Sequence, residues 1–463
     1  MNSSTLHGAE ACAPGTDEDA PKSTPQSLER LLPEDASQRE VVHNEVHARP
    51  TVAIDLPALV VYIALLNENV SRDQECLHMR LLPGQGELDV ERLSGNFLQL
   101  HFEGFSITWE RHTEFTRYSI VQPLAESVSL GASDPDLMSA LRLAPEWLRT
   151  LPGQTIAAIK LACLHGDVTK PAACLEQSRA WFGEHPVLAS MMGAAGHSMV
   201  VTDLMLRASG FEHMLLVAPP ETSSARAGRV TRRVLELETY RILSLRGLSA
   251  AKQLWPMLSD ADRTLSDVMA RLENTLTSDQ ELLDTLVSMA ARVERATTEH
   301  EYYFSATRAY HALVLQRSVE LREQAVPGTQ TLGGFMQRRV APAIATVIAT
   351  EQRLASLSER VSRASALLRT RVDIAAEAQN QQLLEQLTRG QAMQLRLQAT
   401  VEGLSIAAIS YYVVSLLFYG AKSLEASGVA INPEIAVGVS IPLVLGAVCV
   451  VTRRIHRKLR SGI

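Results

Sequence analysis

The chain lacks the sequence motifs of the common catalytic folds. Its 463 residues contain no GxSxG elbow, no phosphate-binding loop and no dinucleotide-binding glycine pattern. Its five cysteines include no CxxC pair, which fits a reducing compartment and argues against a disulfide framework or a zinc ribbon. The formal net charge of −7 gives no reason to expect nucleic-acid binding. These absences favour a protein that is not an enzyme, and the sequence indicates no cofactor.

The N-terminal segment also lacks an apolar stretch. Residues 1–35 are polar and rich in proline, serine, threonine, aspartate and glutamate. A secretory signal peptide needs a continuous apolar core, so we expect none here. A segment of this composition buries too little apolar surface to fold, and we expect a disordered tail.

Long apolar runs occur near the C-terminus, at residues 404–420 and 435–452. Both are uncharged and lie near the lower limit of the roughly 17–25 residues that cross a bilayer. They predict a transmembrane hairpin, with a lipid bilayer as partner. Two buried helices of a soluble core are the alternative.

Basic residues predict the orientation of this hairpin. The loop between the two runs has one lysine, Lys422, whereas residues 453–463 follow the second run with Arg453, Arg454, Arg457, Lys458 and Arg460. Short loops rich in Lys and Arg stay on the cytoplasmic side, so we expect both chain ends there.

One face of the first apolar run carries small and hydroxyl side chains at alternating spacings of three and four: Ser405, Ala408, Tyr412, Ser415 and Tyr419. Such a face allows helices to approach closely and to form hydrogen bonds with each other. We expect a helix-packing face, and a pore lining is the alternative.

Residues 223–403 have the composition of long helices. Apolar residues keep heptad spacing at Leu283, Leu286, Ala290 and Val293, and again at Leu354, Leu357, Val361, Ala364 and Leu368. A turn is expected at Pro327-Gly328. We predict a coiled-coil hairpin of two antiparallel arms that supports a homo-oligomer. A compact bundle of shorter helices is the alternative, and the sequence indicates no protein partner.

Residues 36–222 differ from the helical region, because apolar runs of strand length recur along them. They predict an α+β domain with a largely antiparallel sheet. The predicted strands include residues 56–66, 97–102, 106–109, 115–121, 156–163, 199–204 and 214–217. Residues 106–109 and 115–121 are expected to form a hairpin.

Two polar patches in this domain form a candidate metal or ligand site. The first contains His43, Glu45, His47 and Arg49, and the second contains Glu110, His112 and Glu114. Histidines four residues apart share a helix face, which is a common spacing of metal ligands, whereas in a strand positions 43, 45 and 47 share one side. The alternative is a pair of buried polar networks, and the pattern indicates no particular metal.

A basic face lies near a predicted helix start and contains Arg226, Arg229, Arg232 and Arg233. These arginines either meet an anion or pair with Glu236 and Glu238 along the same helix.

Several blocks resemble the domain of unknown function family 3422. They are HNEVHARP from His43, WERHTEF from Trp109, LELETYR from Leu235, LLRTRVDIAAEAQNQ from Leu367 and LQATVEGLSIAAISYYVV from Leu397. The resemblance implies a membrane-anchored bacterial protein. Together with the basic residues near the C-terminus, it leads us to expect a multi-pass protein of the inner membrane with both termini cytoplasmic. It implies no activity.

Three functional hypotheses follow. The first is a membrane-anchored cytoplasmic scaffold or regulatory protein. The second is a metal-binding enzyme or sensor that uses His43, His47 and His112. The third is a CorA-like oligomeric ion transporter, whose layout is similar, although its Gly-Met-Asn signature is absent and Gly420-Ala421-Lys422 stands in its place. A lysine ring at the mouth of a pore would repel cations, so we favour the first hypothesis.

Overall fold

The computed structural model describes residues 36–39, 51–125, 128–131, 137–273, 278–428 and 432–460. The chain forms two compact units. The sheet unit consists of Met1–Lys252 and His300–Glu351, and the helical unit consists of Gln253–Glu299 and Gln352–Ile463. The patch formed by His43, Glu45, His47 and Arg49 lies outside the described residues.

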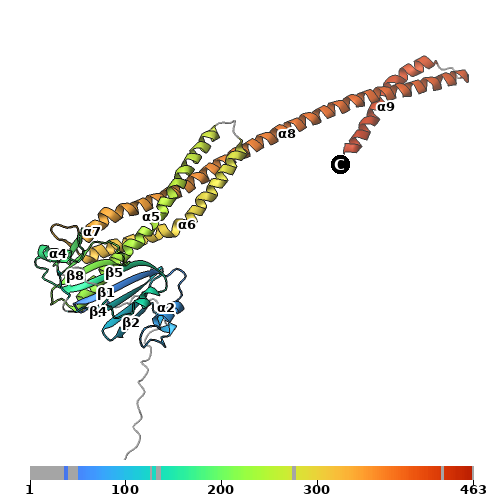
Figure 1. The fold of residues 1–463 in the computed structure, drawn as a ribbon. Coiled ribbons are helices and arrows are strands. Elements are labelled where there is room, and N and C mark those ends of the chain that lie inside the picture. Colours follow the sequence, from blue (N-terminus) through green and yellow to red (C-terminus); the bar gives the residue numbers. More distant parts are fainter. Residues whose placement is uncertain are drawn as a thin grey trace, which may run out of the picture. The chain divides into compact units, whose positions relative to one another are not determined.

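The sheet unit contains a mixed sheet whose nine described strands lie in the order β2-β3-β4-β1-β5-β8-β7-β6-β9. Figure 1 labels β1, β2, β4, β5 and β8 of this sheet. All pairs are antiparallel except β5 with β8, which are parallel. The strands are β1 (Ala58–Leu66), β2 (Phe97–Phe102), β3 (Phe105–Arg111), β4 (Phe115–Pro123), β5 (Gln154–His165), β6 (Leu188–Met192), β7 (Ser198–Thr202), β8 (Glu212–Ala218) and β9 (Gln324–Ala325).

Both faces of the sheet are covered, which explains why β1 is apolar at every position. Alternate side chains of a strand point to opposite faces. Leu59, Val61 and Ile63 join a core with helices α2 (Arg72–Met79), α3 (Pro145–Arg149) and α4 (Pro171–Arg179) and the 3₁₀ helix η1 (Val90–Leu93). Val60 and Tyr62 join the core on the other face, against helices α5 (Ser224–Glu273) and α6 (Asp279–Leu321).

Helices α5 and α6 approach each other closely within the sheet unit at Gly247. A Cβ atom placed on Gly247 would lie 2.4 Å from Thr307 Oγ1 and 3.1 Å from the carbonyl oxygen of Tyr303. Arg246 lies over the Tyr303 ring, with its Cζ 5.4 Å from the ring centroid. Only glycine allows this close approach without displacing α6.

The helical unit contains a bundle formed by parts of α5, α6 and α8 (Ala341–Ala426). α8 follows α7 (Leu332–Phe335) and a π-helical turn, η2 (Met336–Val340). Apolar residues at three-four spacing are buried along α5 (Leu254, Leu258, Ala261, Leu265, Val268), α6 (Leu282, Leu286, Met289, Val293, Ala296) and α8 (Leu354, Leu357, Val361, Ala364, Leu368). Asp262 of α5 accepts hydrogen bonds of 2.7 Å from both Arg353 and Arg360 of α8.

One sequence prediction about these helices needs correction. The core positions of α6 include Leu282 and Met289, whereas the predicted Leu283 is half-buried and Ala290 is exposed. A one-residue change of register turns a helix by about 100°, enough to exchange buried and exposed sides. Helix α5 continues without a break through Pro256.

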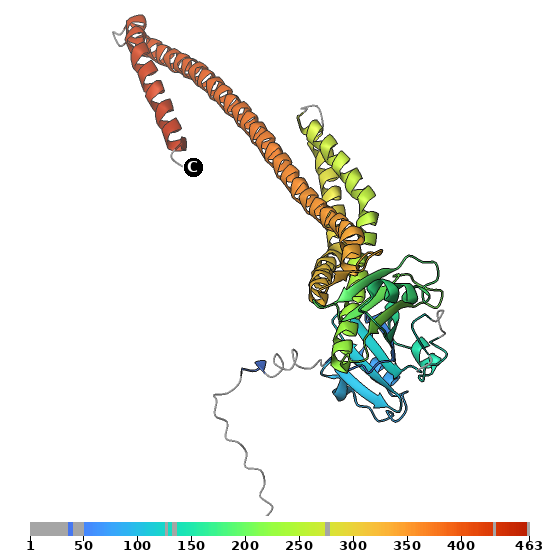
Figure 2. The same cartoon turned by 90° about the vertical axis from the view of Figure 1, so that its left-hand side faces the viewer.

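Two C-terminal helices are long and apolar enough to cross a membrane. They are α8, whose C-terminal part contains the first apolar run, and α9 (Pro433–Arg460). Only 6% of the apolar window of α8 and none of that of α9 is buried. In Figure 2 the orange-to-red ribbon follows α8 as a continuous helix into this region.

Candidate functional site

The candidate site starts from a cross-strand pair. Strands β3 and β4 form the predicted hairpin, and their register places Glu110 directly opposite Arg117. Opposite positions of an antiparallel pair point to the same face, so the two side chains meet. Both are nearly fully buried, with 3% and 6% of their side-chain surfaces exposed.

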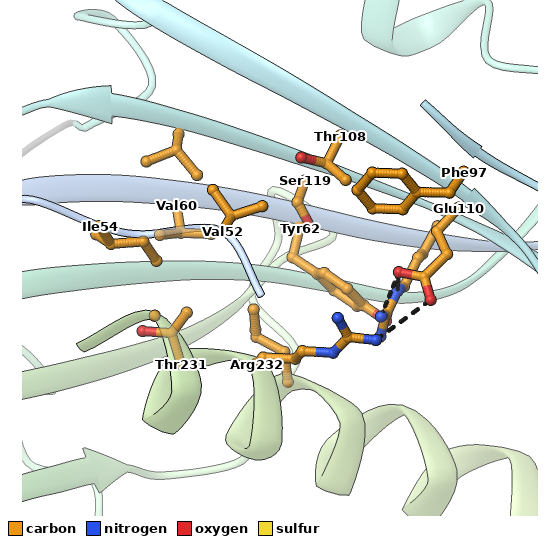
Figure 3. A pocket seen from close by; sticks show the side chains of 14 residues that line it. Val52, Ile54, Val60, Tyr62, Phe97, Thr108, Glu110, Ser119, Thr231 and Arg232 are labelled. Carbon is orange, nitrogen blue, oxygen red and sulfur yellow. Dashed lines mark hydrogen bonds and ion pairs between the residues drawn. The ribbon is translucent and has the colours of Figure 1, made fainter. Parts of the chain in front are cut away.

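Helices α5 and α6 complete a buried ionic network around this pair. Glu236 of α5 accepts hydrogen bonds from Arg117 Nη1 (3.0 Å), Arg232 Nε (2.8 Å) and Arg317 Nε (2.7 Å). Glu110 pairs with Arg117 Nη2 at 2.5 Å. Its other oxygen lies 3.4 Å from Arg232 Nη2, and Figure 3 shows these two labelled side chains next to each other. Charges taken out of water are tolerated only when paired in this way.

The arginines of the network hold the Glu236 carboxylate in the charged form. Burial alone would raise the pKa of Glu236, but Arg117, Arg232 and Arg317 together lower it to about 2. Burial would lower the pKa of Arg117, but Glu110, Tyr62 and Glu236 together more than offset this, so the pKa rises. Glu236 and Arg117 are therefore not poised to exchange a proton near neutral pH.

A small pocket adjoins the network between the sheet and α5. Its lining includes Val60, Tyr62, Glu110, Thr231 and Arg232 (Figure 3). Its volume of about 50 Å³ suffices for a few water molecules but is well below the roughly 300 Å³ of typical ligand sites. Tyr62 Oη hydrogen-bonds to Thr239 Oγ1 at 2.8 Å, so this tyrosine is also fixed. The geometry is that of a structural clamp between the sheet and two helices.

The hairpin turn places His112 and Glu114 beside aromatic rings. The His112 ring stacks on Phe115 with 4.4 Å between centroids, and its Nε2 lies 3.6 Å from Glu110 Oε1. Glu114 lies near Tyr302 and Tyr310, and burial together with this carboxylate raises the pKa of Tyr302 to about 12. His112 also lines an open pocket of about 510 Å³ with Arg72, Arg111 and Tyr310 among its walls.

The structure thus brings Glu110 and His112 together, while the position of His43 and His47 stays untested. Among the described residues, no group of three or more His, Cys, Asp or Glu side chains could hold a metal ion. Glu110 is already paired with two arginines, which makes it a poor ligand for a cation. The metal site therefore stays a prediction that depends on the two histidines outside the described part.

The predicted pairing of the basic face with Glu236 and Glu238 is confirmed for one of its arginines. Arg232 pairs with Glu236, four residues on. Glu238 pairs instead with Arg241 of the same helix. No local pattern in the sequence joins Arg317 to its partner Glu236, because the two residues are 81 positions apart.

Fold and site together define a class of protein: a mixed α/β sheet unit clamped by buried ion pairs, a helical bundle, and two apolar C-terminal helices. The family model described as "Protein of unknown function (DUF3422)" matches residues 34–459, so the chain belongs to this family. This confirms the resemblance found in the sequence. No curated protein matches the chain.

Proposed function

We propose that this protein is a membrane-anchored scaffold or regulatory protein of a bacterial inner membrane, with its sheet unit and both termini in the cytoplasm. The observation that carries the proposal is the exposed apolar surface of α8 and α9. Both helices have several largely exposed apolar side chains. Leu404 and Leu416 of α8 and Leu443 of α9 are each 70–75% exposed. Each leucine gains about 2 kcal/mol on leaving water, so these helices favour a bilayer.

The orientation is supported by the basic residues that follow the second apolar run, since cations are retained on the cytoplasmic side. A direct test places a single reactive cysteine at Ser427, an exposed position between α8 and α9. The matched control places it at Ser94, which is exposed in the sheet unit. Both variants carry Cys12→Ser and Cys449→Ser, so that neither the N-terminal segment nor the half-buried Cys449 of α9 contributes a thiol.

Intact spheroplasts are then treated with a membrane-impermeant maleimide. We expect labelling at position 427 and none at position 94 until the cells are lysed. Labelling of position 94 in intact cells would contradict the orientation. Recovery of the protein in the soluble fraction would contradict the anchor itself.

Self-association through α8 is part of the proposal. Beyond Leu368, α8 carries apolar residues at heptad spacing that are 57–75% exposed: Leu383, Leu387, Leu397, Val401 and Leu404. Asn380 falls on the same stripe, and one polar residue at such a position fixes register in coiled coils. A second copy of α8 offers the same stripe, so we propose a second copy of this chain as the partner.

The alternative of a metal-binding enzyme or sensor predicts stoichiometric zinc, manganese or iron in the purified protein. It also predicts loss of that metal in folded His43→Ala and His47→Ala variants. Elemental analysis decides this directly.

The CorA-like transporter predicts a pentamer with the Tyr412 face turned inward. Tyr412 and Tyr419 are each more than two-thirds exposed in the single chain, so oligomer mass and cross-linking at these positions separate the two readings.

A further inference from the structure

A second large pocket of the sheet unit, of about 390 Å³, is strongly basic. It lies between the β6–β7 turn at Gly193, the first turns of α5, and the end of α6 at Leu321. Its lining includes four arginines, one histidine and a single acidic residue, Glu320. The arginines are Arg226, Arg229, Arg233 and Arg322.

Three of these arginines lack acidic partners among the described residues. Arg233 Nε lies 3.3 Å from Glu320, which also accepts from Arg317, so this pair is satisfied. Within the described part of the chain, the side chains of Arg226, Arg229 and Arg322 form no ion pair, and all three are exposed. The pocket therefore keeps an excess of positive charge.

The position of this charge opposes the stability of α5. Arg226 and Arg229 are three residues apart and Arg229 and Arg233 are four apart, so like charges are neighbours on one helix face. They also lie in the first turns of α5, where the helix dipole disfavours cations. An anion in the pocket would relieve this repulsion and would interact favourably with the positive end of the helix dipole.

Two features describe the wall of the pocket. His197 lines it, and burial together with the charges of Arg226 and Arg229 lowers the pKa of this histidine, which shows that both charges act on this part of the pocket. Its Nδ1 lies 3.1 Å from Ser198 Oγ, and this contact fixes the orientation of the ring. Gly193 has φ +80°, and a Cβ there would lie 2.6 Å from the His197 ring, so glycine is required to seat this histidine.

We propose that this pocket binds a phosphate-bearing ligand through Arg226, Arg229 and Arg322. Arginine holds phosphate oxygens through paired N–H donors, and three of them suit a group with more than one negative charge. The volume exceeds that of a single phosphate and suits a phosphate ester, either soluble or as the headgroup of a lipid. The proposal is independent of the anchor and of self-association.

The test uses the full chain in an uncharged maltoside detergent, with inorganic pyrophosphate as the probe, titrated by calorimetry at low salt. The variant is Arg226→Gln/Arg229→Gln. The matched control is Arg92→Gln/Arg149→Gln, which removes the same charge from two exposed positions of the sheet unit outside the pocket. Circular dichroism verifies that both variants are folded.

We expect saturable binding by the wild type, about 100-fold weaker binding by the variant and little change in the control, since each lost charge-assisted contact is worth about tenfold. Arg322→Gln, which removes an exposed side chain just after α6, should weaken binding about tenfold and serves if the double variant does not fold. No saturable binding by the wild type, or equal weakening in variant and control, overturns the proposal.

A second arm separates the two sources of phosphate. The wild-type chain is placed in nanodiscs of phosphatidylcholine, with or without phosphatidic acid, and the pyrophosphate titration is repeated. Weaker apparent affinity in the phosphatidic acid discs supports a lipid headgroup as the ligand. Equal affinity in both discs supports a soluble phosphate ester.

Discussion

The buried network makes a quantitative prediction about Glu236→Gln. Glu236 accepts hydrogen bonds from three arginines, and only 4% of its side-chain surface is exposed. Its pKa is about 2 instead of the ordinary 4.5. One pKa unit is worth about 1.4 kcal/mol, so the carboxylate contributes about 3 kcal/mol to the free energy of unfolding at pH 7. This agrees with the cost of about 3–5 kcal/mol for breaking a buried ion pair.

Urea unfolding followed by tryptophan fluorescence measures this loss. Trp109, Trp147 and Trp181 are buried in the sheet unit, and replacing the exposed Trp255 of the helical unit by phenylalanine makes the signal report on the sheet unit alone. The matched control is Glu176→Gln. Glu176 is 79% exposed and forms a surface pair, which is worth at most about 1 kcal/mol.

The pH dependence supplies a second measurement on the same variant. Because the folded-state pKa of Glu236 is depressed, its contribution is complete above about pH 4.5 and is lost as the pH falls through about 2. The difference in unfolding free energy between the wild type and Glu236→Gln should therefore shrink between pH 5 and pH 2.5. A loss no larger than that of the control, or a difference independent of pH over this range, would refute the reasoning.

Three further predictions concern the helices and the basic pocket. Gly247→Ala should lower the melting temperature measured by circular dichroism because its Cβ meets α6, whereas Gly390→Ala, with open space around it, should leave it unchanged or raise it slightly. Leu387→Glu should reduce the oligomer mass measured by light scattering, and Gln386→Glu should not; equal masses for both would contradict the α8 interface. The pKa of His197, followed by NMR, should rise in the Arg226→Gln/Arg229→Gln variant, because two nearby positive charges are removed. An unchanged pKa would mean that these two charges do not act on His197.

The sequence predicts the strands well where a long apolar run stands alone. The runs at 97–102 and 115–121 match β2 and β4 within two residues, because each packs a full face against a core. The predicted strands do not include β6 and β9, and for β9 the reason is physical. β9 has only two residues, Gln324 and Ala325, and exists only because β6 pairs with it from more than 130 positions away. The β-strand propensity of the residues around Gln324 gives no indication of such a distant partner.

The candidate site shows a different limit of the sequence. The WERHTEF block identifies Glu110 and His112 as residues of interest, but their role depends on partners in α5 and α6. A buried carboxylate needs a partner, so the sequence predicts one for Glu110 without identifying it. The fold supplies Arg117 across the hairpin and Arg232 from α5. Whether His43 and His47 join them is the question on which the metal hypothesis depends.

The arginines of α5 show why pairing and ligand binding look alike in a sequence. Arg232 and Arg229 are three residues apart, yet one is held by two buried glutamates and the other faces an open basic pocket. Adjacent helix positions differ by about 100° in direction, so neighbouring Arg232 and Arg233 reach different acidic partners. A buried arginine needs an acidic side chain beside it. An exposed arginine stays hydrated, so it costs little free energy when it has no partner. The distinction between a clamp and a binding site on this helix therefore depends on the sheet and on α6, and the anion proposal rests on the face of α5 that those elements leave uncovered.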